Sequence, residues 1–488
     1  MPSNSESIAE QLRGELNAII SRVSKGADTP PSAYETEEQL WVGMLRLGRG
    51  LMQLRFEACY EAEVVQDGIE VNGISYDYQR SSQRAYVSLF GEVQVKRAYY
   101  LNAEYGGLCP LDAVLSLPAR CYSDSVQERL SELNVWVSQD HSLAFVERWL
   151  GLKIPKGSLQ SSVSEQAAYL DGYYAQRPSV AAPGQDSILV ATADGKGIPM
   201  TRADSPPVEA RRSKGSKKTA KKEAIVTALY SVAPYIRDSQ DIIKALLPDG
   251  TDAPKPDIGR PVLSNKQTFG TLEGKPLALT HLVDQVAQRE AAQFTQRVAL
   301  TDGADALQRQ MGDHLPDFTL VLDIIHVTEY VWDAANARFG ETSSQRVVWV
   351  RQSLAWLLED HLDDLLNDLD QHAPQLATTQ GDTLRRVAAY LRRNRSYMDY
   401  QRYLSLGWPI GTGVVEGACR HLVKDRFEQA GMRWSKLGAQ ALLNLRSVAF
   451  NADWDDFQRF RRQQSHLQRY ATPYPDTLLD IFALETAA

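Results

Sequence analysis

Apolar residues recur every three or four positions through most of the first 65 residues, which predicts helices there. Residues 35–64 (ETEEQLWVGMLRLGRGLMQLRFEACYEAEV) show this spacing without a proline break. From residue 68 to 102 apolar and polar positions alternate around Gly91, which predicts a small β-meander or hairpin. Residues 125–171 then favour three helices with short breaks, the first capped by Ser123 or Asp124. This segment is helix-turn-helix-like, although plain helical packing explains it equally.

Strands alternate with helices after residue 187, which is typical of an α/β sheet. From about 343 to 403 the pattern is wholly helical, and we interpret this stretch as an insertion. We therefore expect an α/β core with an α-helical insertion, preceded by a helical and β-hairpin region. The expected segments are 1–120 (helices and hairpin), 121–180 (helix-turn-helix-like DNA-binding region), 181–340 (first part of the core), 341–405 (insertion) and 406–488 (rest of the core and the tail).

Composition places the chain among ordinary globular proteins and leaves few special classes open. None of its apolar runs reaches eighteen residues, so we expect no membrane span, and the acidic start is unlike a secretory signal. We expect a cytoplasmic, nucleoid-associated protein. The four cysteines, Cys59, Cys109, Cys121 and Cys419, lack the paired spacing of a structural zinc site, so we interpret them as free thiols.

Charge is unevenly distributed along the chain. The net charge of −8 argues by itself against a nucleic-acid binder. Residues 385–470, however, hold sixteen Lys/Arg against seven Asp/Glu, whereas residues 301–384 hold four Arg against fifteen Asp/Glu. One surface could therefore follow DNA phosphates while an acidic one binds metal, or both could simply face water.

Three acidic residues stand where a purely structural role is hard to assign. Asp194 and Asp302 each end a short apolar stretch and precede a glycine, and Glu416 opens a helix behind a glycine-rich loop. Carboxylates at strand ends lie in an open crevice, although such an Asp is also a common helix cap or turn former. Two Mg²⁺ (or Mn²⁺) ions need several carboxylates, because hard cations prefer oxygen ligands. We therefore predict that Asp194, Asp302 and Glu416 hold two metal ions.

The same residues carry a resemblance to a known family. Residues 408–435 (WPIGTGVVEGACRHLVKDRFEQAGMRWS), with ADGKGIP at 193–199, KKEAIVTALYSV at 221–232, TDGA at 301–304 and LDIIHVTEYVW at 322–332, resemble insertion-sequence transposases of the Kra type. The chain resembles Mutator-like DDE enzymes more distantly. The likeness extends over nearly the whole chain and is most specific around Glu416.

This resemblance implies a fold, a reaction and a set of site residues. It implies an RNase H-like core interrupted by helices, and transposition of an insertion element by DNA cleavage and strand transfer. Asp194 matches the first catalytic Asp. Asp302 and Asp323 compete for the second. Mutator-like enzymes place a C/D-x-x-H signature shortly after the second Asp, and Asp323-Ile-Ile-His326 fits that signature, which favours Asp302. In that case His326 is an accessory catalytic residue; otherwise it is a satisfied core histidine.

Further consequences concern partners and a missing zinc site. The expected partner is double-stranded DNA, both the inverted repeats of the element and the target, with at least a homodimer in the active complex. Relatives often carry paired cysteines near residues 100–112, which suggest a zinc ribbon. Here Cys109 stands without such partners, so a metal-stabilised N-terminal module is not expected.

Basic residues near these motifs are candidates for DNA contact, because Lys and Arg neutralise phosphates. A solvated loop or ordinary ion pairs are the alternative for each group. Trp434 could stack on an unpaired base or belong to the core. The candidates are a basic loop (Arg211, Arg212, Lys214, Lys217, Lys218, Lys221, Lys222), the residues after Glu416 (Arg420, Lys424, Arg426, Arg433, Trp434) and an arginine cluster in the insertion (Arg385, Arg386, Arg392, Arg393, Arg395).

Other function classes remain as alternatives to a transposase. A domesticated, non-catalytic DNA-binding relative would not need to keep all three acidic positions. A glycosidase-like hydrolase with paired carboxylates would place them among aromatic sugar platforms rather than Lys/Arg clusters. A DDE-fold nuclease that cuts without strand transfer has the same sequence features as a transposase.

Overall fold

The chain divides into two compact units, one of them built from both ends of the sequence. The computed structural model describes residues 3–24, 31–177, 187–204, 221–247, 261–289, 294–429 and 431–470. The N-terminal unit comprises Met1–Tyr169 together with Trp454–Ala488, and the core unit comprises Leu170–Asp453. The expected last segment, 406–488, is thus shared between the two units. Among the described helices, none is long and apolar enough to cross a membrane.

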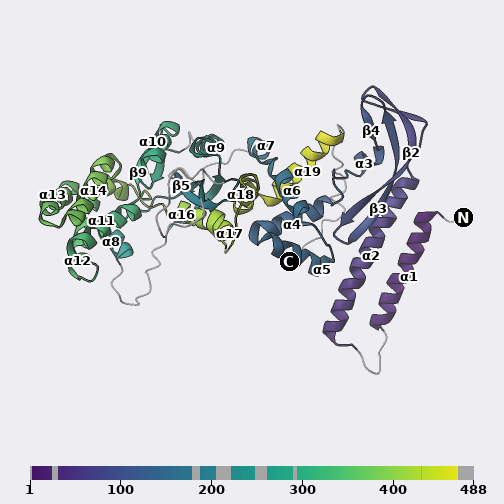
Figure 1. Cartoon of the computed structure of the whole chain (residues 1–488), viewed down its shortest axis with the longest axis horizontal. Coiled ribbons are helices and arrows are strands. Elements are labelled where there is room, and N and C mark those ends of the chain that lie inside the picture. Colours follow the sequence, from purple (N-terminus) through teal and green to yellow (C-terminus); the bar gives the residue numbers. More distant parts are fainter. Residues whose placement is uncertain are drawn as a thin grey trace. The chain divides into compact units, whose positions relative to one another are not determined.

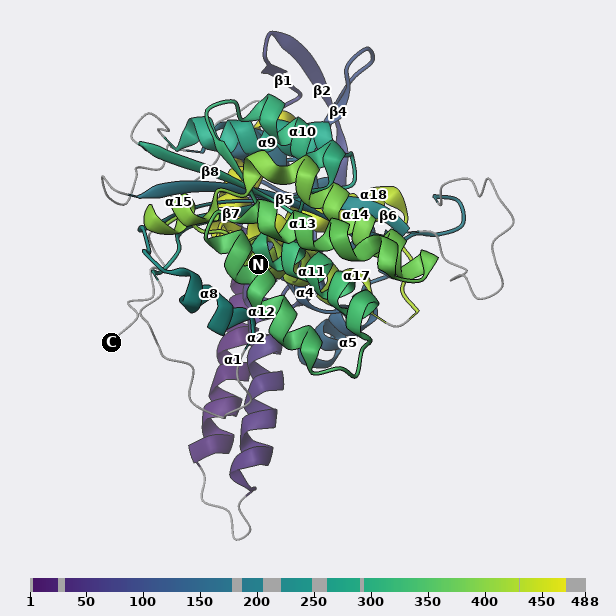
Figure 2. The same cartoon turned by 90° about the vertical axis from the view of Figure 1, so that its left-hand side faces the viewer.

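The N-terminal unit begins with a helical hairpin and a small antiparallel sheet, as the pattern predicts (Figures 1 and 2). Ser32 caps the second helix through a capping box with Glu35. The turn between the two long strands contains Gly91, whose φ of 121° suits glycine. The elements are α1 (Asn4–Ser24), α2 (Ala33–Glu61), β1 (Gly68–Val71), β2 (Ile74–Ser88), β3 (Gly91–Asn102) and β4 (Gly106–Leu108), with sheet order β1-β2-β3-β4.

The rest of this unit is helical. Ser123 caps α4 as predicted, since its hydroxyl accepts a 3.1 Å hydrogen bond from the Val126 N–H. The last helix returns to this region, because Arg461 donates to Asp124 at 2.9 Å and Gln458 donates to Gln166 at 2.8 Å. The helices are α3 (Pro110–Val114), α4 (Asp124–Trp136), α5 (Gln139–Leu150), α6 (Lys156–Ala167) and α19 (Trp454–Tyr470). The three predicted helices are thus α4, α5 and α6.

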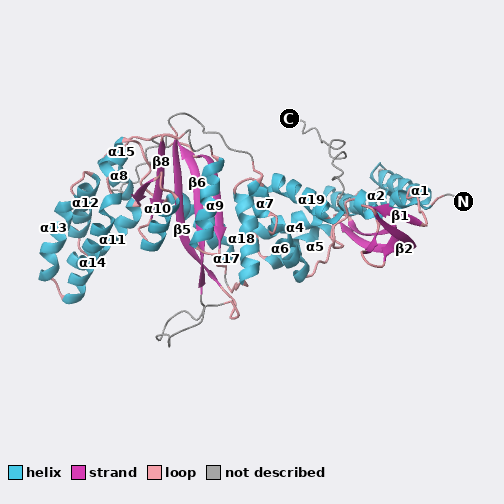
Figure 3. Ribbon diagram, turned by 90° about the horizontal axis from the view of Figure 1, so that it is seen from above, coloured by secondary structure: helices cyan, strands magenta, loops and turns pink. Residues whose placement is uncertain are grey.

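The core unit is built on a five-stranded mixed sheet, so a mixed α/β fold is confirmed (Figure 3). Strands β5, β8 and β9 run parallel, and β6 is antiparallel to both of its neighbours, β5 and β7. The sheet order is β7-β6-β5-β8-β9. The strands are β5 (Ile188–Pro199), β6 (Lys221–Val232), β7 (Ser264–Thr271), β8 (Gln296–Thr301) and β9 (Thr319–Leu322).

Alternate residues of the strands pack against helices on the two faces of the sheet. Ile188 and Val190 of β5 face a core shared with α8 and α11 to α15, whereas Leu189 and Ala191 face α9 and α10. The helices are α7 (Leu170–Ala175), α8 (Ser239–Leu246), α9 (Lys275–Gln288), α10 (Asp305–His314), α11 (Ile324–Phe339), α12 (Gln345–Leu358), α13 (Leu362–His372), α14 (Thr378–Asn394) and α15 (Tyr400–Ser405), with short 3-10 turns η2 (Ala373–Gln375) and η3 (Arg395–Tyr397). Residues 345–405 are therefore helical, as predicted.

The chain after α15 forms the last helices of the core unit. They are α16 (Gly413–Ala418), the π-helix η4 (Cys419–Lys424), α17 (Asp425–Phe427) and α18 (Lys436–Phe450). Helix α16 packs against β5 and β6, and α18 packs against β7. Glu416 therefore lies in a helix directly above the strand that carries Asp194.

The arginine cluster of residues 385–395 forms surface ion pairs with acidic side chains, and the paired arginines remain about half exposed. The N···O distances include 3.0 Å for Arg386–Asp333, and Arg393 donates to the Gly303 carbonyl at 2.8 Å. The segregated charges of the sequence thus meet in space, which explains much of the asymmetry. The remaining pairs are Arg385–Asp382, Arg392–Asp370 and Arg395–Asp363.

Candidate functional site

Three aspartates occupy one row across the parallel part of the sheet. Strand β5 pairs with β8 up to Thr192↔Leu300, and β8 pairs with β9 up to Thr301↔Leu322. Continuing these registers places Asp194 level with Asp302, and Asp302 level with Asp323. The prediction that Asp194 ends its strand is wrong, because β5 continues to Pro199 as a hairpin with β6. Asp194 lies instead where the parallel pairing with β8 stops.

The three side chains belong to the same face of the sheet. Alternation from Val190, Leu300 and Val321, which all contact the core around α11, directs Asp194, Asp302 and Asp323 to that face. Asp194 and Asp302 are half-buried, and Asp323 is fully buried. The register of the strands therefore brings three carboxylates together although they are far apart in the sequence.

Asp194, Asp302 and His326 lie close enough together for their charges to affect the pKa of Asp194. Burial raises the pKa of Asp194, and the negative charge of Asp302 raises it further. The Gly195 N–H, at 2.6 Å from Oδ1, and the thiol of Cys419 act in the opposite direction, as does the positive charge of His326. Asp194 is thus a carboxylate whose charge is only partly compensated by the protein.

Asp323 is held by hydrogen bonds on both carboxylate oxygens. Oδ1 accepts from the Ile325 N–H at 3.0 Å and from the Thr412 N–H at 3.2 Å. Oδ2 accepts from His326 Nδ1 at 2.6 Å and from the Thr412 hydroxyl at 2.6 Å. A carboxylate offers about four acceptor sites, so all of them are engaged. Asp323 is also the N-cap of α11, and it therefore fixes both the helix and the loop before α16.

Asp302 is placed differently from Asp323. Its Oδ1 accepts one bond, from the Ala304 N–H at 2.8 Å, and its side chain is half-exposed. The backbone around it is fixed, because Tyr390 donates to the Asp302 carbonyl at 3.2 Å and Arg393 to that of Gly303. Asp302 thus keeps acceptor capacity for a ligand while its backbone is held by the insertion helices.

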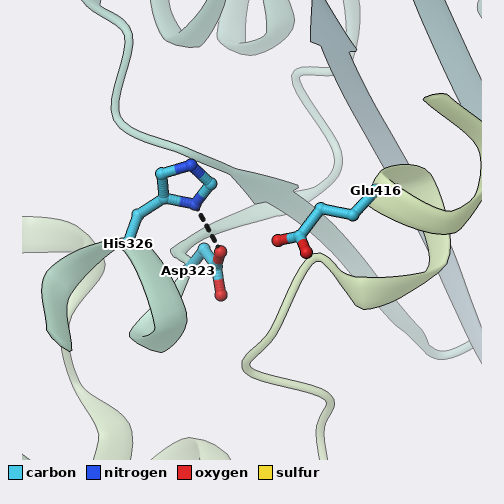
Figure 4. Close-up of side chains that lie close together, drawn as sticks. All are labelled: Asp323, His326 and Glu416. Atoms are coloured by element: carbon cyan, nitrogen blue, oxygen red, sulfur yellow. Dashed lines mark hydrogen bonds and ion pairs between the residues drawn. The ribbon is translucent and has the colours of Figure 1, made fainter. Parts of the chain in front are cut away.

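The carboxylate of Glu416 points toward Asp323 and His326 (Figure 4). The Thr412 hydroxyl lies 2.6 Å from Oδ2 of Asp323 and 2.9 Å from Oε1 of Glu416. One ligand atom from each of Asp323, His326 and Glu416 lies within 4.8 Å of the others, a spacing that could hold a metal ion. The hydroxyl has one hydrogen for two carboxylates, so a cation here would relieve their repulsion.

The group of possible metal ligands among the described residues differs from the predicted triad of Asp194, Asp302 and Glu416, because only Glu416 belongs to both. Asp323, His326 and Glu416 form the close group, and Asp194 and Asp302 flank it on the adjoining strands. The sequence analysis missed Thr412 and the contact of Cys419 with Asp194. Their signal was their position, since Thr412 lies within the glycine-rich loop and Cys419 lies three residues after Glu416.

The helix after Glu416 widens into a π-helix, and a buried arginine holds it. Arg446 of α18 donates to the carbonyl oxygens of His421 and Leu422, and burial lowers its pKa to about 9. A π-helix frequently occurs at a functional site, where it shifts side chains relative to a regular helix. Here η4 begins at Cys419, the residue that contacts Asp194.

Two of the predicted DNA contacts belong to the core instead. Arg426 is 1% exposed and lies with its guanidinium 5.0 Å from the ring centre of Trp434. Trp434 is 8% exposed and donates its indole N–H to the Phe427 carbonyl at 3.2 Å. Neither side chain can reach DNA in this arrangement, so the core alternative holds for Trp434 and the phosphate role of Arg426 was wrong.

The other basic candidates have varied positions. Arg211, Arg212, Lys214, Lys217 and Lys218 lie outside the described residues. Lys221 pairs with Glu428, and Lys222 is half-buried at the start of β6. Arg420, Lys424 and Arg433 are exposed, and Arg420 Nε lies 3.9 Å from Asp425. Arg420 and Lys424 both lie within the π-helix η4.

A cavity of about 670 Å³ opens beside Asp302 and His326. Its remaining wall comes mainly from α11 and α14, and it mixes acidic side chains with aromatic rings. Tyr330 and Tyr390 stack with ring centres 3.8 Å apart. The lining residues are Asp302, Gly303, Ala304, His326, Glu329, Tyr330, Trp332, Asp333, Arg386 and Tyr390. The site is therefore open to a ligand from the side of the insertion helices.

Comparison with known proteins adds no relative. No family model matches the chain, and no curated protein matches it. Function therefore has to be inferred from the chemistry of the site: four carboxylates, one histidine and one threonine hydroxyl around the end of a parallel sheet.

We expect the stability of the metal-free protein to fall with rising pH through His326. The hydrogen bond from Nδ1 to Asp323 raises the pKa of His326 from 6.5 to about 9. Between these values the folded state binds a proton that the unfolded state lacks, so the contribution is complete below pH 6.5 and lost through pH 9. Urea unfolding with chelator should show a smaller loss for His326→Gln than for wild type; identical pH dependence would contradict the Asp323–His326 pairing.

Proposed function

We propose that the chain is a DDE-type DNA transposase, similar to those of the Kra type, which cleaves and joins DNA by metal-dependent phosphoryl transfer. The observation that carries the proposal is the arrangement of acidic groups. Asp194, Asp302 and Asp323 occupy one row where the parallel strand pairing stops, and Glu416 approaches Asp323 from a helix after a helical insertion. Each comes from a different element, and together they form one open, acidic site.

The order of the sheet supports an RNase H-like core. Numbered along the chain, the strands of the core unit follow the order 3-2-1-4-5, with the second strand antiparallel to its neighbours. This agrees with the arrangement of RNase H-like folds. Helices α12 to α15 intervene between β9 and the Glu416 helix, where the resemblance places the insertion.

The residues of the site fit divalent cations. Asp323 and Glu416 lie beside His326, and one threonine hydrogen is shared between these two carboxylates. The charge of Asp302 also acts on His326 and on Asp194. The half-exposed Asp302, the partly compensated Asp194 and Glu416 offer oxygen ligands of the kind that Mg²⁺ or Mn²⁺ prefers. Two such ions, when bound, activate the attacking oxygen and stabilise the leaving oxygen of a phosphodiester. We assign these three residues as ligands.

Asp323 and His326 then have supporting roles in the same site. Asp323 orients His326 and Thr412, and Thr412 in turn holds Glu416. His326 bonds Asp323 through Nδ1, which leaves Nε2 for another partner, and the residue lines the cavity beside Asp302. His326 is thereby placed to donate a hydrogen bond to a phosphate oxygen next to Asp302.

Double-stranded DNA is the proposed partner, and its phosphates need basic groups outside the acidic centre. Arg420, Lys424 and Arg433 are exposed on the segment that follows Glu416, on the same part of the chain as a catalytic carboxylate. The basic loop 211–222 connects β5 to β6 and is proposed as a second contact. Helices α4 to α6 are proposed as the helix-turn-helix-like module that reads the element ends.

The test is a cleavage assay on the DNA that flanks the gene. Purified protein with Mg²⁺ or Mn²⁺ should cut fragments that carry the flanking inverted repeats, and chelation should stop the reaction. Covalent joining of the cut 3′ ends to a target plasmid identifies a transposase, whereas cutting without joining identifies a nuclease. Binding of these fragments without metal-dependent cutting would refute a catalytic role and favour a regulator.

A further inference from the structure

The α1–α2 hairpin of the N-terminal unit carries an exposed apolar face on one side. Leu16, Ile20 and Val23 of α1 are 42%, 55% and 54% exposed, and Met44 and Leu51 of α2 are 54% and 51% exposed. The C-terminal end of α1 and the N-terminal end of α2 extend beyond the small sheet (Figures 1 and 2). Water-exposed apolar side chains gathered in this way commonly mark an interaction site.

The contact line between the two helices shows that these residues share one side. A Cβ on Gly43 would meet Ile19, and a Cβ on Gly50 would meet Leu12, so the two glycines face α1. Successive residues of an α-helix are rotated by about 100° around the helix axis. Met44 and Leu51 therefore point about 100° away from the direction of Gly43 and Gly50, which face α1. Leu16 and Ile20 lie roughly 40° and 80° past Leu12. In antiparallel right-handed helices these rotations turn toward the same side of the pair.

The opposite side of α2 is used inside the unit. Phe56 of α2 packs with Val93 of the small sheet, and Gln53 donates to the Gln94 carbonyl at 3.0 Å. Trp41, about 60° around the helix from Met44, donates its indole N–H to the Trp149 carbonyl of α5 at 2.9 Å. Phe90, in the turn between β2 and β3, lies against Gly48, so the unit borders the apolar face on this side. Met44 and Leu51 are still 54% and 51% exposed among the described residues, which leaves room for a partner.

We propose that a second copy of the chain covers this face, with the two hairpins packed as an antiparallel four-helix bundle. The face is formed by two helices, so two copies of it can bury each other around a two-fold axis. A 21-residue helix is roughly 30 Å long, and two helices are about 20 Å wide. The projected face is on the order of 600 Å², close to the roughly 800 Å² per partner of a stable interface.

Charge on the same face selects the antiparallel arrangement. Glu37 lies seven residues before Met44, and Arg55 lies four residues after Leu51, so an acidic and a basic group flank the apolar row. Both charged side chains are exposed. Antiparallel packing of α2 on its copy brings Glu37 to the partner's Arg55 and places Met44 near the two-fold axis. Parallel packing would instead place like charges together, which disfavours it.

The test compares two neighbouring, equally exposed residues on opposite sides of α2. Met44 and Val42 are both 54% exposed, but Val42 lies on the other side of the hairpin. Full-length wild type should sediment as a dimer at micromolar concentration. Met44→Glu should raise the dissociation constant at least about tenfold, since a charge buried in an apolar interface is costly, and Val42→Glu should leave it unchanged. Circular dichroism establishes that both variants keep the fold.

Cross-linking gives a second, geometric readout. Met44→Cys should form an intermolecular disulfide with its own copy, whereas Val42→Cys should not, and a mixture of Glu37→Cys with Arg55→Cys should cross-link only in the mixed pair. A monomeric wild type, an equal effect of Met44→Glu and Val42→Glu, or equal cross-linking at residues 42 and 44 would overturn the proposal. The inference does not depend on catalysis, so loss of DNA cleavage would leave it intact.

Discussion

Replacing Asp302 by Asn should abolish metal-dependent DNA cleavage while leaving the fold and DNA affinity nearly unchanged. The amide keeps the size of the side chain and can still accept the bond from the Ala304 N–H. It removes the negative charge that a divalent cation needs, so we expect a loss of about 10³-fold or more in the cleavage rate. Asp194→Asn and Glu416→Gln should have equally large effects, because each supplies a separate ligand.

A nearby aspartate provides the control for this experiment. Asp305 is exposed, begins α10 and pairs with Arg309 at 2.7 Å. Asp305→Asn changes the net charge by the same amount but should retain near-normal cleavage. Rates measured on one labelled DNA substrate over a range of Mg²⁺ concentrations would compare the variants. Near-normal cleavage by Asp302→Asn would show that Asp302 is no metal ligand. Loss with Asp323→Asn alone would assign that role to Asp323 if circular dichroism shows this variant to be folded under the assay conditions.

Replacing Asp323 by Asn should destabilise the core unit strongly, in contrast to Asp302. Asp323 is fully buried, and its two oxygens accept four hydrogen bonds, two of them from Thr412. An Asn has one acceptor oxygen, so at least one donor loses its partner. Hydrogen bonds to charged groups are worth about 1.5–3 kcal/mol each, so we expect a loss of about 3 kcal/mol in the free energy of unfolding.

Urea unfolding followed by circular dichroism measures this loss. Asp302→Asn, whose side chain is half-exposed, should change stability by less than about 0.5 kcal/mol. Thr412→Val, which removes the hydroxyl but keeps the volume, should lose part of the same stability, and Thr412→Ser should retain it. Equal, small effects of Asp302→Asn and Asp323→Asn would mean that the hydrogen-bond network around Asp323 does not hold the site together.

Sequence periodicity predicted the elements well, because each is decided locally. The three-to-four spacing of residues 35–64 became α2, the alternation around Gly91 became β2 and β3, and Ser123 capped α4. The helical stretch before Glu416 was also correct. Strand ends at Asp302 and Asp323 could be inferred because an apolar run stops at a polar residue that can accept a turn or cap bond.

The sequence did not show how the residues of the site are arranged in space. The shared row of Asp194, Asp302 and Asp323 depends on strand register, which involves residues more than a hundred positions apart. Arg426 is buried and most arginines of 385–395 form surface ion pairs, and the sequence showed neither arrangement. A run of basic residues does not show which acidic segment it will pair with in the folded protein. The extension of β5 beyond Asp194 likewise depends on pairing with β6, which the residues of β5 alone do not show.

The position of α19 has a consequence for how the protein is synthesised. Arg461 bonds Asp124, and Gln458 bonds Gln166. Helices α4 and α6 are therefore synthesised long before α19, the helix that they pack against. Residues 170–453 leave the ribosome in between, which takes roughly 15–60 s at about 5–20 residues per second. During that interval the polar groups of α4 and α6 that α19 will satisfy remain open to water, chaperones or another nascent chain. The N-terminal unit can therefore be completed only after the core unit has been translated in full. A chain truncated before residue 454 would lack α19 and would leave the N-terminal unit incomplete.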